Sequence, residues 1–131
     1  MRLLMDEEHQ YRVLAFDAIT ADNLGAEIAR VLAGSDPPLL RAMWEACGLD
    51  ERLRDFGRGL RIETHERLAA ALARARTARN IQRPALDAST AAWATLMMGA
   101  AATDPSGIDD VPKVIEVLAF GGRDDMERVP A

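Results

Sequence analysis

The stretch THERLAAALARARTARN, from Thr64 to Asn80, decides the fold class of this chain. Six of its residues are alanine, which has the best helix propensity, and Leu68, Leu72 and Ala75 share one helical face. Thr64 is placed to cap this helix, and Pro84 prevents a smooth continuation beyond it. A narrow stripe of small apolar side chains predicts close packing against other helices.

The composition of the whole chain agrees with this. Twenty-four of the 131 residues are alanine, whereas Phe, Trp and Tyr together number six. β-Sheets favour β-branched and aromatic residues, which are scarce here, and the length suits one domain. We therefore expect an all-α fold, a compact single-domain bundle of five to seven short helices over residues 1–122. A mobile C-terminal tail is expected at 123–131.

Residues that are typical of helix ends divide the rest of the chain into further helices. Asp36 followed by Pro37 is the clearest helix start. Asp50 is expected to cap a separate short basic helix, which Gly57 and Gly59 weaken. Residues 11–19 fit either a helix or a strand, and helix is favoured because a lone strand would have no partner. The other expected helices cover about 24–32, a segment that Asp87 or Ser89 opens, and 110–118.

Trp44 and Trp93 are the two largest side chains in the sequence. Each lies in the middle of an apolar stripe with helical spacing. Because aromatic residues are so scarce among the alanines, we predict that both tryptophans fill the core.

The charges are unevenly distributed along the chain. Residues 52–83 carry nine arginines against three acids, whereas residues 1–51 have a balance of −6 and residues 84–131 one of −5. Such asymmetry indicates either an anion-binding surface or an internal match between basic and acidic elements.

Three interpretations of the basic segment are open: solvation of an alanine-rich helix, docking of another protein, and binding of nucleic acid. Docking is favoured over nucleic acid because the helix after Pro84 carries no cation, which would be unusual for a recognition helix. Arginine is also frequent at the energetic centres of protein interfaces. The candidate partner-binding residues are Arg76, Arg79 and Arg83, which share one sector of a helix, and Arg54, Arg58 and Arg61.

Motifs for catalysis or cofactors are weak. Asp6-x-x-His9 is half of a di-iron motif that is needed twice, so no metal site is expected, and His9 is predicted to lie on the surface of a frayed N-terminus. Cys47 is predicted to be a buried, inert thiol near a helix C-terminus, where a thiolate is disfavoured. No glycine pattern forms a phosphate-binding loop, so no cofactor is expected.

The sequence thus predicts a non-enzymatic macromolecule-binding protein that acts through protein–protein contacts. We expect a small regulatory, inhibitory or assembly factor of bacterial, phage or mobile-element type. The alternative is a DNA- or RNA-binding helical domain that uses residues 52–83, and the third reading is a small enzyme with a carboxylate site. The acidic N-terminus does not fit a signal peptide, and no apolar run spans a membrane, so a cytoplasmic location is expected. Homo-oligomerisation is left open.

Overall fold

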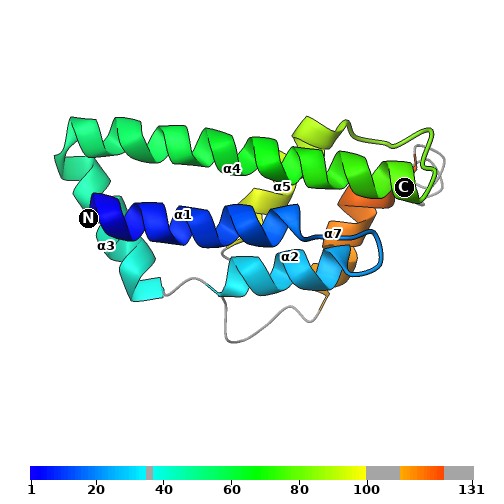
Figure 1. The fold of residues 1–131 in the computed structure, drawn as a ribbon, viewed down its shortest axis with the longest axis horizontal. Coiled ribbons are helices and arrows are strands. Elements are labelled where there is room, and N and C mark those ends of the chain that lie inside the picture. Colours follow the sequence, from blue (N-terminus) through cyan, green and yellow to red (C-terminus); the bar gives the residue numbers. More distant parts are fainter. Residues whose placement is uncertain (35–36, 100–109, 123–131) are drawn as a thin grey trace, which may run out of the picture.

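The computed structural model describes residues 1–34, 37–99 and 110–122, which form an all-α bundle (Figure 1). The predicted fold class is confirmed. The predicted mobile tail, 123–131, lies outside the described residues. The helices in the described ranges are α1 (Arg2–Asp17), α2 (Leu24–Ala33), α3 (Pro37–Leu49), α4 (Glu51–Ala78), α5 (Ala88–Met97) and α7 (Val111–Phe120).

Helix α1 resolves the ambiguous segment 11–19 as helix up to Asp17. Its buried residues are Met5, His9, Val13 and Phe16, whose spacing of four, four and three places them on one helical face. This face packs along α4, beside which α1 runs for most of its length (Figure 1). Tertiary packing therefore begins in the first turns of the chain, and the N-terminal segment is not frayed.

Helix α4 corrects a prediction. The expected short basic helix and the helix from Thr64 are one continuous helix of 28 residues. Asp50 caps it, accepting a hydrogen bond from the Arg52 amide at 2.9 Å. Thr64 is not a cap: its hydroxyl donates to the Leu60 carbonyl at 2.9 Å, within the helix. Gly57 is tolerated because α1 packs onto it, and a Cβ there would lie 2.9 Å from Met5 Cε.

The hydrophobic core lies toward one end of the bundle, where α1, α5 and α7 pack against α4 and α2 packs on α7 (Figure 1). Alanines on α4, α5 and α7 allow these helices to approach closely. We define this region as the packed half, and its buried residues are Phe16, Ile19, Leu24, Ile28, Val31, Leu32, Leu68, Ala71, Leu72, Ala75, Ala91, Ala92, Val111, Ile115 and Ala119.

The tightest helix contact of the packed half joins α2 to α7. A Cβ placed on Gly25 would lie 2.5 Å from the carbonyl oxygen of Pro112 and 2.7 Å from Glu116 Cγ. Only glycine fits at this distance without a shift of the α7 backbone.

The other end of the bundle is built differently. Helix α3 begins at Pro37, as predicted, although Asp36 lies outside the described residues. It packs mainly against the first half of α4 and contributes no residue to the core cluster of the described chain. Apolar side chains of α3 therefore do not meet the core.

Candidate functional site

Both tryptophans lie outside the core, so the prediction that they fill it is wrong. Trp44 on α3 is 68% exposed and Trp93 on α5 is 41% exposed. The core is filled instead by Phe16, leucines and isoleucines of the packed half. The predicted apolar stripe of α3 is present, but it faces a groove and not the core.

This groove has a volume of about 770 Å³ and lies between α1, α3, α4 and α5. Its surface is mostly apolar, and both tryptophans line it. The described residues that line it are Met5, Glu8, His9, Arg12, Leu32, Met43, Trp44, Cys47, Gly48, Arg54, Gly57, Arg58, Leu60, Arg61, Thr64, Trp93, Leu96 and Gly99. We define the region around it, α3 with the first halves of α1 and α4, as the groove half.

The two tryptophan rings are held by neighbours on α4. The Trp93 ring stacks on His65, with ring centroids 3.9 Å apart and an angle of 11° between the planes. His65 is itself fixed, because its Nε2 lies 2.9 Å from the Ser89 carbonyl oxygen. The Arg61 guanidinium lies 5.5 Å from the centre of the Trp44 ring, a cation–π contact. The groove therefore presents aromatic surfaces that are already positioned.

The charged residues of the groove are mainly basic. Among the described residues, Arg12, Arg54, Arg58 and Arg61 line it against one acid, Glu8. This is a net positive lining on a protein whose formal net charge is −5.

The arginines of this lining differ in how much of their bonding capacity the fold uses. Glu8 pairs with Arg12 across one turn of α1 at 3.4 Å. The Arg54 guanidinium donates to the carbonyl of Cys47 at 3.2 Å and so helps to satisfy the end of α3. Arg58 lies 3.8 Å from Asp55 in an exposed pair. Three of the six predicted partner-binding arginines, 54, 58 and 61, thus line one groove.

The other three predicted arginines do not form one surface. Arg76 is buried, at 7% exposure, and its Nε donates to the Ala119 carbonyl at 2.6 Å. Desolvation lowers the pKa of Arg76, and the nearby Asp87 carboxylate opposes that shift. Arg79 donates to the Ala21 carbonyl at 2.7 Å and covers the Phe120 ring at 4.1 Å, while Arg83 is exposed.

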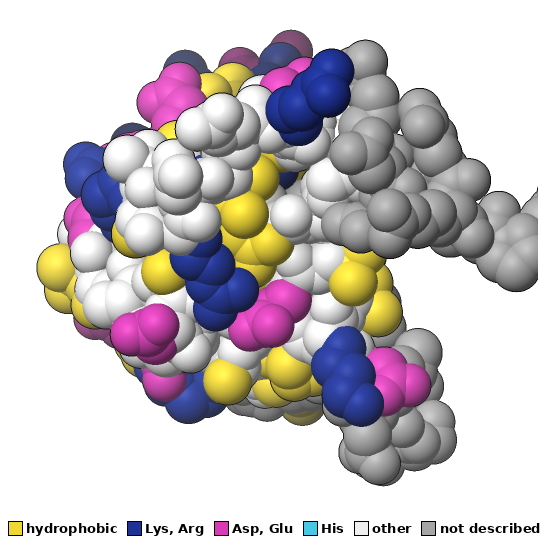
Figure 2. All heavy atoms as spheres, turned by 90° about the vertical axis from the view of Figure 1, so that its right-hand side faces the viewer, with side chains coloured by type: hydrophobic (Ala, Val, Ile, Leu, Met, Phe, Trp, Pro, Cys, Tyr) yellow, Lys and Arg dark blue, Asp and Glu magenta, His cyan; other side chains and the backbone are white. Residues whose placement is uncertain are grey.

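These contacts tie the end of α4 to α7 and to the segment before α2. Figure 2 shows this end of the molecule, where basic side chains lie dispersed among acidic and apolar ones. The expected basic face at 76, 79 and 83 is therefore absent from the part of the surface that the structure describes, because helix α7 ends against Arg76.

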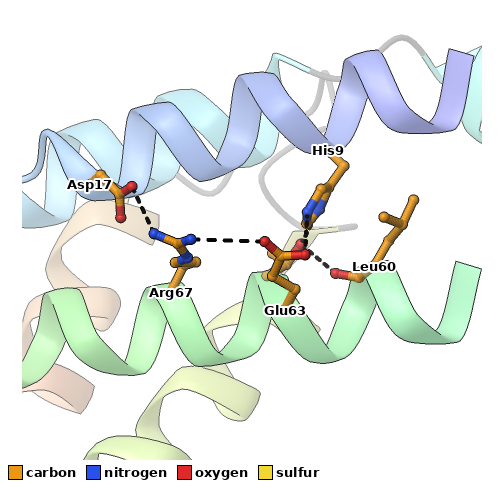
Figure 3. Close-up of polar contacts among 6 residues, drawn as sticks. His9, Asp17, Leu60, Glu63 and Arg67 are labelled. Atoms are coloured by element: carbon orange, nitrogen blue, oxygen red, sulfur yellow. Dashed lines mark hydrogen bonds and ion pairs between the residues drawn. The ribbon is translucent and has the colours of Figure 1, made fainter. Parts of the chain in front are cut away.

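His9 is buried at 4% exposure, which corrects its predicted place on the surface. Its Nδ1 lies 3.1 Å from Thr64 Oγ1, and its Nε2 lies 3.2 Å from Glu63 Oε2 (Figure 3). Because the Thr64 hydroxyl donates to Leu60, His9 Nδ1 must carry a proton and donate to Thr64.

The polar contacts between α1 and α4 continue along the two helices beyond His9. Arg67 lies 3.9 Å from Glu63 and donates to Asp17 at 3.2 Å (Figure 3). These ion pairs therefore hold α1 aligned on α4.

The candidate chemical residues do not assemble into a reactive centre in the described ranges. Cys47, which was predicted to be buried, is only half-buried, because α3 faces the groove; its Sγ lies 3.8 Å from the Leu53 carbonyl oxygen, a long contact. Asp6 is exposed on α1, whereas His9, about one turn further along, is buried. Within residues 1–34, 37–99 and 110–122, no three His, Cys, Asp or Glu side chains gather closely enough to hold a metal ion.

Reasoning from the sequence missed the tryptophans as site residues. One signal was available: Met43 precedes Trp44, and methionine is common on surfaces that accept varied apolar partners.

The described helices include none with the length and apolarity needed to cross a bilayer. No protein-family model matches the chain, and no curated protein or solved structure is significantly similar to it.

Proposed function

We propose that the protein is a non-enzymatic binding protein, a small regulatory or assembly factor whose groove receives an apolar helical segment of a partner protein. The observation that carries the proposal is the presence of two exposed tryptophans, Trp44 and Trp93, on the walls of one apolar groove. Tryptophan is the residue type most enriched at the energetic centres of interfaces.

The helical walls of the groove and its positioned aromatic rings support a helical partner. Its walls are themselves helices, α1, α3, α4 and α5, and an amphipathic helix inserts its apolar face into such a groove through residues at i, i+3, i+4 and i+7. The rings of Trp44 and Trp93 are already stacked or covered, so little side-chain entropy is lost when a partner binds.

A small apolar molecule is a second candidate for the groove. Its volume, about 770 Å³, falls within the range of roughly 300–1,000 Å³ that is usual for sites of small ligands. Nucleic-acid binding by residues 52–83 is less favoured, because Arg76 and Arg79 contact main-chain carbonyls of the same chain.

The test is recovery of the partner from the native host with matched variants. Trp44→Ala combined with Trp93→Ala removes both aromatic walls, and Val117→Ala, an exposed apolar residue of α7 outside the groove, is the control. We expect wild type and control to retain one partner in stoichiometric amounts and the double variant to lose it while its circular dichroism stays helical.

Hydrogen exchange on the recovered complex should then protect the groove half. Retention of the same partner by the double variant would contradict the proposal. A small molecule that copurifies with the wild type, detected by native mass spectrometry and lost from the double variant, would favour the second candidate.

A further inference from the structure

We propose that the groove selects a partner helix whose apolar face is flanked by acidic residues, a refinement that rests on the proposed function. The part of the groove lining that the structure describes carries four arginines and a single glutamate, although the protein as a whole is acidic. A positive lining inside a negative molecule is a local feature that favours partners of opposite charge.

The arginines of α4 lie in a row beside the groove. Arg54, Arg58 and Arg61 are spaced at i, i+4 and i+7, so they share one side of α4 over about 10 Å of helix axis. All three line the groove, which places the row along one wall next to Trp44. A partner helix that lies in the groove alongside α4 would therefore have about two of its turns next to this row of arginines.

Arg58 and Arg61 have bonding capacity left for such a partner. The guanidinium of Arg61 lies on the Trp44 ring and has no carboxylate within 4.0 Å in the described part of the chain. Among the described residues, Arg58 has only the long, exposed pair with Asp55, which contributes little and exchanges readily. Arg54, by contrast, is already bonded to the end of α3.

Within the described ranges, Asp55 offsets part of the positive row through its exposed pair with Arg58, and the other acids near the groove do not cancel it. Glu8, on the opposite wall, is paired with Arg12, and Asp6 lies outside the groove beside Phe56. A carboxylate of the partner would find planar, bidentate donors at Arg58 and Arg61, and a lysine of the partner would meet charges of its own sign.

A displayed library of amphipathic helices tests this inference. Each helix is about 16 residues long, roughly four turns, with leucine fixed on one face and the flanking positions randomised among Glu, Lys and Gln. The bait is the full chain as wild type or as one of three variants. The first joins Arg58→Gln with Arg61→Gln, and the second joins Arg41→Gln with Arg83→Gln, which removes equal charge outside the groove. The third is the double tryptophan variant.

We expect the wild type and the Arg41/Arg83 control to enrich Glu at flanking positions three or four residues apart, and the Arg58/Arg61 variant to lose that preference. A selected peptide should bind the Arg58/Arg61 variant about tenfold more weakly at low salt, and the difference should shrink as salt rises.

Two other outcomes separate the two proposals. Enrichment of Lys or Gln, or Glu enrichment that the Arg58/Arg61 variant keeps, overturns the charge selection and leaves groove binding intact. Peptides retained equally by the double tryptophan variant, or no selected peptide at all, overturn groove binding and the selection with it.

Discussion

The two halves of α4 differ in how completely other helices bury them. In the packed half, Leu68, Ala71, Leu72 and Ala75 are almost completely buried in the core cluster, where α1, α5 and α7 pack against α4. In the groove half, the buried residues of α4 are few, Leu53, Gly57 and Thr64, and the aromatic surface beside them is left open. The comparison shows that the buried apolar core lies at one end of α4 and the open aromatic groove at the other.

Side-chain size explains why the halves differ. Small residues on α4, α5 and α7 let these helices come close enough to exclude water, so medium-sized side chains such as Phe16 and Ile115 complete the core. Trp44 is on α3, which adds nothing to the core cluster, so this large ring has no interior to fill. Exposed apolar surface that is gathered in one groove is typical of sites that bind another molecule.

The largest expected effect is a contrast in stability between a core phenylalanine and a groove tryptophan. Phe16→Ala should lower the free energy of unfolding by about 3–5 kcal/mol, because Phe16 is fully buried and leaves a cavity. Trp44→Ala should cost less than about 1 kcal/mol, mainly the contact with Arg61. Urea unfolding followed by circular dichroism measures both. Equal costs would mean that the groove half is part of the cooperative core.

A second contrast concerns two arginines that look alike in the sequence. Arg76→Ala should cost about 1.5–3 kcal/mol, because a charged donor to the last carbonyls of α7 is lost in a buried site. Arg61→Ala should change stability by less than about 1 kcal/mol, because its guanidinium is exposed. Urea unfolding measures the change in the free energy of unfolding for both variants. A loss at Arg61 as large as that at Arg76 would show that Arg61 has a structural role.

Glycines sharpen the comparison further. Gly25→Ala should destabilise the protein by about 1–3 kcal/mol, because the new methyl group meets the Pro112 carbonyl on α7. Gly59→Ala, on the groove half of α4, has open space around it and should stabilise the helix by up to about 1 kcal/mol. Thermal unfolding of the two variants measures opposite shifts of Tm. A stabilising Gly25→Ala would mean that α2 and α7 are not closely packed.

Local signals in the sequence were enough for much of the fold. Helix propensity predicted the all-α class, and caps predicted the start of α3 at Pro37 and of α4 after Asp50. These signals act within one turn, so a single sequence contains them. The continuity of α4 was missed because glycine propensity at Gly57 is overridden by the packing of Met5 from a distant part of the chain.

The candidate site was only partly predictable for the same reason. Arg58 and Arg61 were named as candidates from charge alone, and the structure places them in the groove. The role of Arg76 could not be read from the sequence, because it depends on where α7 ends in space. Helical periodicity showed that Trp44 belongs to an apolar face, but periodicity does not say whether such a face meets a core or a groove.

The smallest expected effect concerns the cap of α5, the helix that joins the two halves by supplying core alanines and Trp93. Asp87 accepts a hydrogen bond from the Thr90 amide at 2.7 Å, and this bond is the main cause that holds the pKa of Asp87 below its ordinary value of 3.8. A carboxyl with a lowered pKa stabilises the folded state above its unfolded pKa, and this contribution disappears as pH falls through the lower folded value.

Asp87→Ala should therefore lower the urea midpoint at neutral pH, and its difference from wild type should shrink in strong acid, below 3.8. Asp87→Asn is the matched control, because asparagine also caps a helix but does not titrate. Its midpoint relative to Asp87→Ala should not depend on pH. If Asp87→Ala stays equally destabilised in acid, the cap acts through its shape and the carboxylate charge contributes nothing. If its tryptophan emission also changes at neutral pH, the cap of α5 sets the position of Trp93, and the packed half then governs the geometry of the groove.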